Sequence, residues 1–330
     1  MSKSTKKSMI QGKAYEYACL MAIDNAVSGV RSVSIAMNPS YYVAKGCFDQ
    51  ISDKDKRIMN ASATAAIDAI LKMEPRITEV ADDDLSILLQ PDNVAQAGDV
   101  RDIVIARPGI KWEIGISVKH NHNALKHSRL SSGIDFGKSW FNLQCSPEYF
   151  NEIKPVFDSL DALKKKGTVW ANVPNKMDTV YVPVLNAFMN ELRKLFAENN
   201  DIVTHGVIKY LLGSNGNDYY KLIHDDKKQK TIIIPFNLHN GLNKPSSALA
   251  PEIKIPEFKL SPQIVSVEYK PKSKTTVVMD MDDDWAISFR IHSASTKVEA
   301  SLKFDIRLSK QPDDLFEYVV NWCELLDIDE

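Results

Sequence analysis

Hydrophobic residues recur along this 330-residue chain with two different periods, which predict a mixture of helices and strands. Spacings of three and four residues predict helices over 11–27 and 50–72, and further helices near 148–164, 184–198 and 202–212. Alternation of apolar and polar residues over 264–308 predicts an antiparallel meander. Apolar spacing over 312–326 predicts a closing amphipathic helix.

Two apolar runs in the first half of the chain predict a β-hairpin. The runs are Asp102–Ala106 and Trp112–Lys119, and the link between them contains Pro108-Gly109, a pair typical of turns. Residues 28–48 have the punctuation of turns and a strand, and 215–262 has that of loops around one strand. This order of elements predicts an α+β (mixed α/β) fold, because it is not a regular βαβ series.

Composition places the chain among ordinary globular proteins. Hydrophobic residues make up 44% and charged residues 25%, which excludes disordered and fibrous classes. No run approaches the ~20 apolar residues of a spanning helix. The polar, basic first eight residues lack the apolar core of a secretion signal, and the four cysteines show no C-x-x-C pair. We therefore expect reduced thiols and a cytoplasmic location.

The charge is unevenly distributed. Residues 311–330 contain seven acids and no Lys or Arg. Their negative charge exceeds the net charge of the whole chain, which is −2. Residues 1–310 are therefore net positive. Residues 111–140 hold five Lys or Arg against two acids, together with three of the seven histidines. A local basic surplus of this kind is consistent with a polyanion-binding face, although a solvated helix face gives the same count.

The predicted hairpin brings an acid and a lysine together. A turn centred on Pro108-Gly109-Ile110 places Asp102 opposite Ser117, with Lys119 on the diagonal at ~7–8 Å. These three side chains then share one face of the hairpin. A register slip of one residue reverses the faces and favours Asp99 instead of Asp102.

An acid and a lysine at one strand end suit the hydrolysis of a phosphodiester. Such a site needs carboxylates that hold a divalent metal ion, and a positively charged side chain near the attacking water. A second acid is missing two residues before the lysine, where Ser117 stands. Three acids could replace it, namely Glu113, Glu16 and Asp135. Glu113 lies ~20 Å from Lys119 along the strand, which is too far for one metal ion. Of the other two, Glu16 in the first helix ranks first and Asp135 second.

The quoted residues resemble a known family of nucleases. Asp102…Ser117-Val118-Lys119 resembles the PD-(D/E)xK nuclease signature with serine in place of the second acid, and Gly12…Glu16 resembles the helix acid that precedes that signature. The long segment from Trp112 to Trp140 resembles more narrowly the HaeIII-type type II restriction endonucleases, as does Gly98–Val104. The narrow resemblance is densest over residues 10–25 and 98–141.

The resemblance implies Mg²⁺-dependent cleavage of double-stranded DNA at GGCC, between G and C, with blunt ends. We expect metal ligands among Asp102, Glu16 and Asp135, a lysine, Lys119, that stabilises the attacked phosphate and orients water, and a hydroxyl on Ser117 that supports these groups by hydrogen bonding. A palindromic site favours a homodimer, because protein symmetry then mirrors DNA symmetry. The resemblance also implies a prokaryotic cytoplasm and a companion DNA methyltransferase as functional partner.

We expect two regions within this scheme. Residues 1–212 would form the catalytic PD-(D/E)xK core with helical elaborations, and 213–330 a β-rich region that contributes to DNA recognition and ends in the closing helix. A polar segment after the catalytic lysine is expected to contact DNA phosphates and groove edges: Asn121, His122, Asn123, Lys126, His127, Ser128 and Arg129.

Three alternatives remain at this stage. The histidines His120, His122 and His127 could bind zinc, although no cysteine pair or fourth ligand is spaced to help. In function, the rivals are a structure-specific repair or recombination nuclease, and a catalytically silent DNA-binding module. The second rival is suggested by Ser117, because an acid is usual at that position.

Overall fold

The computed structural model describes residues 3–91, 99–120, 126–212, 217–257, 263–293, 295–310 and 315–326. The chain divides into two compact units. The mixed-sheet unit comprises Lys3–Asn123, Gly213–Phe258 and Leu315–Glu330. The antiparallel-sheet unit comprises Ala124–Leu212 and Lys259–Asp314. Both units take residues from each side of position 212, where we expected one region to end.

The mixed-sheet unit is built on seven strands among the described residues, in the order β1-β2-β3-β4-β6-β7-β12. The β1–β2 and β4–β6 pairs are parallel and the other neighbours are antiparallel. This arrangement confirms a mixed α+β fold. The strands are β1 Val33–Ile35, β2 Leu85–Leu89, β3 Ile103–Arg107, β4 Trp112–His120, β6 Tyr219–Asp225, β7 Lys230–Phe236 and β12 Tyr318–Asn321.

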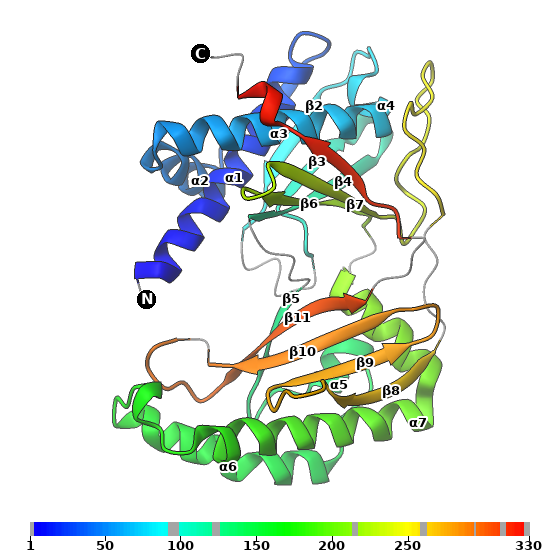
Figure 1. The fold of residues 1–330 in the computed structure, drawn as a ribbon. Coiled ribbons are helices and arrows are strands. Elements are labelled where there is room, and N and C mark those ends of the chain that lie inside the picture. The colour runs from blue at the N-terminus through cyan, green and yellow to red at the C-terminus, as the bar shows by residue number, and fades with distance from the viewer. Residues whose placement is uncertain are drawn as a thin grey trace. The chain divides into compact units, whose positions relative to one another are not determined.

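Helices cover one face of this sheet (Figure 1). Alternate residues of the central strands, such as Ile103, Ile105, Ile114 and Ile116, are buried against apolar side chains of the helices. Alternation is the sheet's period, so one side of each strand contributes to this core. The helices are α1 Lys3–Val27, α2 Pro39–Gln50, α3 Asp53–Met73 and the short α4 Pro75–Thr78.

Helix α2 was not expected, because Asn38-Pro39 was interpreted as a turn. The same two residues begin the helix. The Asn38 side chain accepts a hydrogen bond from the backbone N–H of Tyr41, and Pro39 occupies the first turn. Proline is favoured there because its missing N–H has no partner within the helix in any case.

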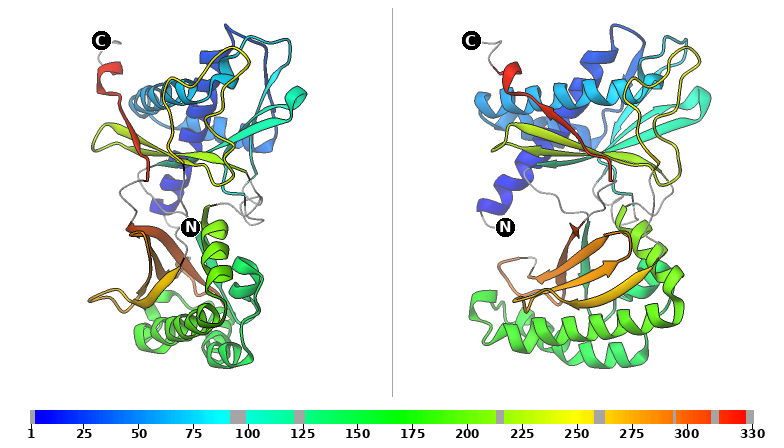
Figure 2. Two further views of the ribbon diagram at one scale, coloured as in Figure 1. Left: turned by 90° about the vertical axis from the view of Figure 1, so that its right-hand side faces the viewer. Right: turned by 45° about the vertical axis from the view of Figure 1, so that its right-hand side comes forward.

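The antiparallel-sheet unit contains the expected meander. Its strands pair in the order β5-β11-β10-β9-β8, and Figure 2 shows α6 and α7 alongside this sheet. Phe188 of α7 packs on Phe289 and Phe304 of the sheet, with ring centroids 5.4 and 4.9 Å away. The elements are β5 Lys126–Leu130, α5 Phe136–Phe141, α6 Pro147–Lys165, α7 Val182–Leu212, β8 Ile264–Tyr269, β9 Thr276–Met281, β10 Ala286–His292 and β11 Leu302–Lys310.

Two expected helices, 184–198 and 202–212, are the halves of α7. They are separated at Asn199, whose backbone has non-helical angles (φ −144°, ψ 50°). A π-helical turn, Met177–Tyr181, precedes α7, and a 3-10 turn, Trp170–Asn172, lies before it. The expected helix near 148–164 is α6.

The helix predicted over 312–326 is wrong for the described residues. Strand β12 and a 3-10 turn, Cys323–Leu325, lie there instead. Phe316, Tyr318 and Val320 pack against the core, which is a spacing of two residues and therefore the period of a strand. Strand β6 was also missed, because 215–262 contains many residues that favour turns. Its strongly apolar neighbours in the sheet stabilise it as a strand.

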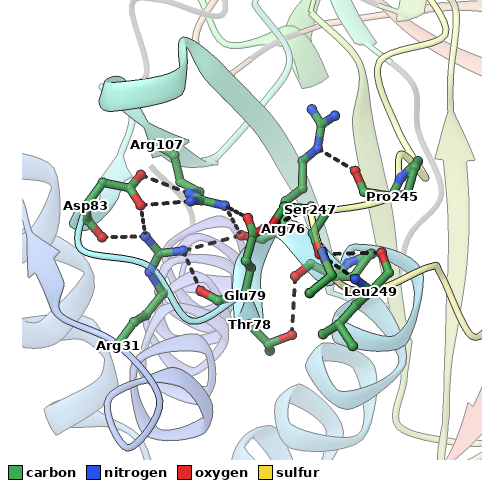
Figure 3. A network of polar contacts seen from close by, with 12 residues as sticks. Arg31, Arg76, Thr78, Glu79, Asp83, Arg107, Pro245, Ser247 and Leu249 are labelled. Carbon is green, nitrogen blue, oxygen red and sulfur yellow. Dashed lines mark hydrogen bonds and ion pairs between the residues drawn. The ribbon is translucent and has the colours of Figure 1, made fainter.

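An ion-pair network fixes the end of the sheet where β3 terminates (Figure 3). Asp83 accepts from Arg31 at 2.7 Å and from Arg107 at 2.8 Å. Arg107 also pairs with Glu79, which accepts from the backbone N–H of Ser247 at 2.8 Å. These contacts connect β3 and the loop that follows α1 to residues 245–249. They therefore stabilise the β3–β4 hairpin at the end opposite Asp102.

A buried carboxyl group makes the stability of the mixed-sheet unit dependent on pH. Glu74 is fully buried, and it accepts hydrogen bonds from the Tyr220 hydroxyl at 2.7 Å and the Asn243 backbone at 2.6 Å. Burial raises the pKa of Glu74 from 4.5 to about 7, although these donors oppose the shift. The folded protein therefore holds a proton on Glu74 at pH values where the unfolded chain has lost it.

We expect the free energy of unfolding to fall as pH rises from about 4.5 to about 7, because the folded state binds more protons in that window. The glutamine of Glu74→Gln carries no charge at any pH. The free energy of unfolding of this variant, relative to that of the unaltered protein, should therefore rise by about 2–3 kcal/mol between about pH 5 and about pH 8. Urea unfolding of both proteins at the two pH values measures this difference. Parallel pH profiles would contradict it.

All four cysteines are free thiols, and Cys19, Cys47 and Cys145 are buried. Within the described residues, no helix has the length and apolar character needed to cross a membrane.

Candidate active site

The β3–β4 hairpin has the register that the turn predicted. Ile103 pairs with Ile116 and Arg107 with Trp112, which places Asp102 opposite Ser117. The Asp102 backbone N–H donates to the Ile116 carbonyl at 2.8 Å, so the pairing continues past the end of β3. The expected shared face of Asp102, Ser117 and Lys119 is confirmed.

Three donors converge on one carboxylate oxygen of Asp102. The Lys119 ammonium lies 3.2 Å from Oδ2, the Val118 backbone N–H donates to it at 2.6 Å, and the Ser117 hydroxyl donates at 3.3 Å. None of the described residues donates to Oδ1. The Asp102 side chain is 24% exposed and that of Lys119 is 19% exposed. The described residues therefore orient Asp102 through one of its two oxygens.

Glu16 of α1 belongs to the same site. It is nine-tenths buried, and the Lys13 ammonium lies 2.9 Å from its carboxylate. Burial first, and then the negative charge of Asp102, raise the pKa of Glu16 to about 7, against the positive charges of Lys13 and Lys119. Two carboxylates that repel each other in this way are suited to share a cation.

Asp99 does not take the position of Asp102. Its carboxylate is held by the Arg101 guanidinium at 2.7 Å and by the Gln90 amide at 2.8 Å. Arg101 also pairs with Glu113 at 2.8 Å. The Arg101 side chain crosses β4 directly over Gly115, where an added Cβ would lie 1.9 Å from its Cδ. Gly115 is therefore needed for this close approach, and it lets the Asp99–Arg101 pair pack beside the site.

Lys221 is a residue that we did not predict. It lies on β6, paired with Ser117 of β4, so the two side chains share a face of the sheet. It is only 4% exposed, and burial, followed by the positive charge of Lys119, lowers its pKa to about 7. A single lysine in the apolar run Tyr219–Ile223 was the available signal. It was missed because β6 was not recognised.

Asp135 is not brought together with Asp102 in one unit. It lies in the antiparallel-sheet unit, where it caps α5. Its Oδ1 accepts from the backbone N–H groups of Lys138 at 2.9 Å and Cys145 at 3.2 Å. These bonds give the carboxylate a structural role at a helix N-terminus.

The predicted DNA-contacting segment is described only in part. Asn121, His122 and Asn123 lie outside the described residues, as do the side chains of Lys126 and His127. Ser128 is buried, with its hydroxyl 2.9 Å from that of Tyr210. Arg129 pairs with Glu299 and donates to the Ser301 hydroxyl, both at 2.8 Å. DNA contact by these residues remains a prediction.

A buried acid on a helix, an acid at a strand end and a lysine on the neighbouring strand are the groups expected of a nuclease, the class of protein that hydrolyses phosphodiesters. Comparison with known proteins identifies the family of nucleases. The sequence model of the HaeIII restriction endonuclease family matches residues 12–312. The type II restriction enzyme HaeIII of Haemophilus aegyptius is 41% identical over 97% of this chain and 100% of its own length.

The chain therefore belongs to the HaeIII restriction endonuclease family, and it is a site-specific deoxyribonuclease of type II. The family resemblance that we inferred from the motifs is confirmed. No solved structure matches the chain.

Proposed function

We propose that this protein cleaves double-stranded DNA at GGCC, between G and C, and that Asp102, Glu16, Lys119 and Ser117 form its active site. The recognition sequence is the one that the resemblance to HaeIII-type enzymes implies. The observation that carries the site is the convergence of the Lys119 ammonium and the Asp102 carboxylate, 3.2 Å apart, beside the buried Glu16.

The donor set fits Mg²⁺. This ion prefers hard oxygen ligands, and the site offers two carboxylates. Burial, and then the negative charge of Asp102, raise the pKa of Glu16, and a cation between the two carboxylates would relieve their repulsion. Asp102 and Glu16 would hold the ion, and Ser117 would support Asp102 through its hydrogen bond to that carboxylate. A bound Mg²⁺ supplies Lewis-acid polarisation of the scissile phosphate and a water of lowered pKa.

Lys119 acts on the phosphate and on the attacking water. Its ammonium is held beside Asp102, so it is oriented before DNA binds. From this position it donates to a phosphate oxygen and stabilises the negative charge that develops as the phosphorus–oxygen bond forms. Lys221, on the same face of the sheet, adds a second amine close to Lys119.

The core is proposed to be of the PD-(D/E)xK type. Support comes from the order of its parts: a helix that carries an acid, an acid at the end of β3, and a lysine near the end of β4 in a mixed sheet. A palindromic target favours a homodimer, in which each protomer cleaves one strand. We also propose a cytoplasmic location and a companion DNA methyltransferase that protects the same sequence.

Digestion of a plasmid of known sequence tests this function. With Mg²⁺ we expect discrete fragments whose ends all lie within GGCC, and no cleavage after chelation of the metal. Sequencing of the ends reports both the site and whether the ends are blunt. Cleavage directed to branched DNA would support a repair nuclease instead, and binding without cleavage would support a silent DNA-binding module.

A further inference from the structure

Two histidines and an aspartate meet where β4 and β6 end. His120 is paired with His224 across the parallel β4–β6 ladder, and Asp226 follows β6. His224 Nε2 lies 2.5 Å from Asp226 Oδ1, and His120 Nε2 lies 3.4 Å from Asp226 Oδ2. One ligand atom from each of the three residues lies within 4.8 Å of the other two.

The His224 ring is held in one orientation by its other nitrogen. Nδ1 lies 2.7 Å from the Ser62 hydroxyl, which also contacts the hydroxyls of Tyr15 at 2.8 Å and Thr231 at 2.7 Å. The ring is fully buried and stacks on Trp322, with centroids 5.2 Å apart. A hydrogen bond at the second imidazole nitrogen is the usual way in which proteins orient a metal-binding histidine. This network therefore presents Nε2 toward Asp226.

This cluster shares no residue with the proposed active site. His120 follows Lys119 directly on β4, so the two side chains point to opposite faces of the sheet. The His120 ring lies on the helix-covered face, with its centroid 6.2 Å from that of Tyr15. Asp102 and Ser117 belong to the other face, whereas Glu16 lies on α1 next to Tyr15. An active-site variant is therefore needed to measure binding at one cluster apart from binding at the other.

We propose that His120, His224 and Asp226 bind one transition-metal ion of the Zn²⁺ class. Two imidazole nitrogens and one carboxylate are donors that suit Zn²⁺ and similar ions, whereas Mg²⁺ prefers oxygen ligands throughout. The ion takes the position of the proton between His224 and Asp226. Zinc bonds of ~2.0–2.2 Å hold the ligand atoms of a tetrahedral site roughly 3.3–3.6 Å apart, so His224 Nε2 and Asp226 Oδ1, which lie 2.5 Å apart, have to separate by about 1 Å.

Rotation of Asp226 can supply this movement. Its side chain is 38% exposed, whereas those of His120 and His224 are 7% and 0% exposed. The exposed carboxylate is also the first ligand that an ion arriving from solvent meets. The buried histidines then form the rigid half of the site.

Titration with Co²⁺ tests the proposal, because Co²⁺ bound to nitrogen ligands absorbs visible light. The full-length protein is first treated with a chelator and dialysed. We expect one equivalent of Co²⁺ to give visible absorption that Zn²⁺ abolishes and excess Mg²⁺ does not. Asp226→Asn should weaken binding at least ~10-fold. The matched control is Asp225→Asn, which alters the adjacent carboxylate that accepts from the Lys228 backbone and should bind Co²⁺ unchanged.

Asp102→Asn distinguishes this site from the active site. It removes the catalytic carboxylate and should leave Co²⁺ absorption unchanged. The proposal is overturned if the unaltered protein gives no absorption, if Asp226→Asn titrates like the unaltered protein, or if Asp102→Asn abolishes the signal. Because the unaltered protein is itself a decisive sample, the result does not depend on the folding of any variant. The proposal also stands or fails independently of cleavage at GGCC.

Discussion

Lys119→Ala is expected to lower the rate of DNA cleavage by about 10³-fold, the size of effect seen when a group that stabilises transition-state charge is removed. Lys119 is the ammonium nearest Asp102 among the described residues, and its side chain is only 19% exposed. DNA binding should persist, because it rests on many phosphate contacts and falls with salt concentration. Initial rates on a plasmid, and gel-shift titration without divalent metal, measure the two quantities.

The matched control for Lys119→Ala is Lys45→Ala. Lys45 lies on α2 in the same unit, is 44% exposed and pairs with Asp49 at 2.8 Å. Its loss removes the same charge from the surface of the unit and should leave cleavage unchanged. Asp102→Asn should lower the rate of cleavage at least as far as Lys119→Ala does. If Lys119→Ala cleaves at the normal rate, the assignment of this site is wrong, and the catalytic residues lie elsewhere in the chain.

Glu16→Gln is expected to lower cleavage by at least ~10²-fold and to raise the Mg²⁺ concentration needed for half-maximal activity. The fold should tolerate this change. With a pKa of about 7, Glu16 is protonated in much of the population near neutral pH when no cation is bound, and glutamine has the same shape as that neutral form. Cleavage rates over a Mg²⁺ titration, with circular dichroism as the check on folding, provide the measurement.

Asp135→Asn is the comparison that separates the two candidate acids. Asparagine is also a good helix cap, so the α5 N-terminus should persist, with a small loss of stability from the weaker contact to Cys145. We expect its Mg²⁺ dependence to match that of the unaltered protein. The reverse pattern, a raised Mg²⁺ requirement for Asp135→Asn alone, would make Asp135 the second ligand and exclude Glu16.

The central hairpin could be predicted from the sequence because its information is local. The Pro108-Gly109 turn sets which residues face each other, and the alternation along two short strands sets which side chains share a face. These two features are enough to bring Asp102, Ser117 and Lys119 together. The confirmed register excludes Asp99 as the alternative to Asp102, and the carboxylate of Asp99 is paired with Arg101.

The helical and strand periods were ambiguous at the end of the chain. Apolar residues over 312–326 fit a helix when taken alone, yet Phe316, Tyr318 and Val320 contact the core as a strand does. The edge of β7 decides between them, since it offers unpaired backbone groups to Tyr318–Asn321. A segment this short takes the structure that its neighbour stabilises.

The sequence by itself determined the elements whose contacts lie within about twenty residues: the hairpin, most helices and the meander. Only the tertiary structure decided which distant segments meet. Strand β6, about one hundred residues after β4 in the chain, pairs with it and brings Lys221 beside Ser117 and His224 beside His120. Helix α1, near the start of the chain, contributes Glu16 to the same group of residues. Local periodicity sets the face that a side chain takes, but the partner of that face depends on how the whole core packs.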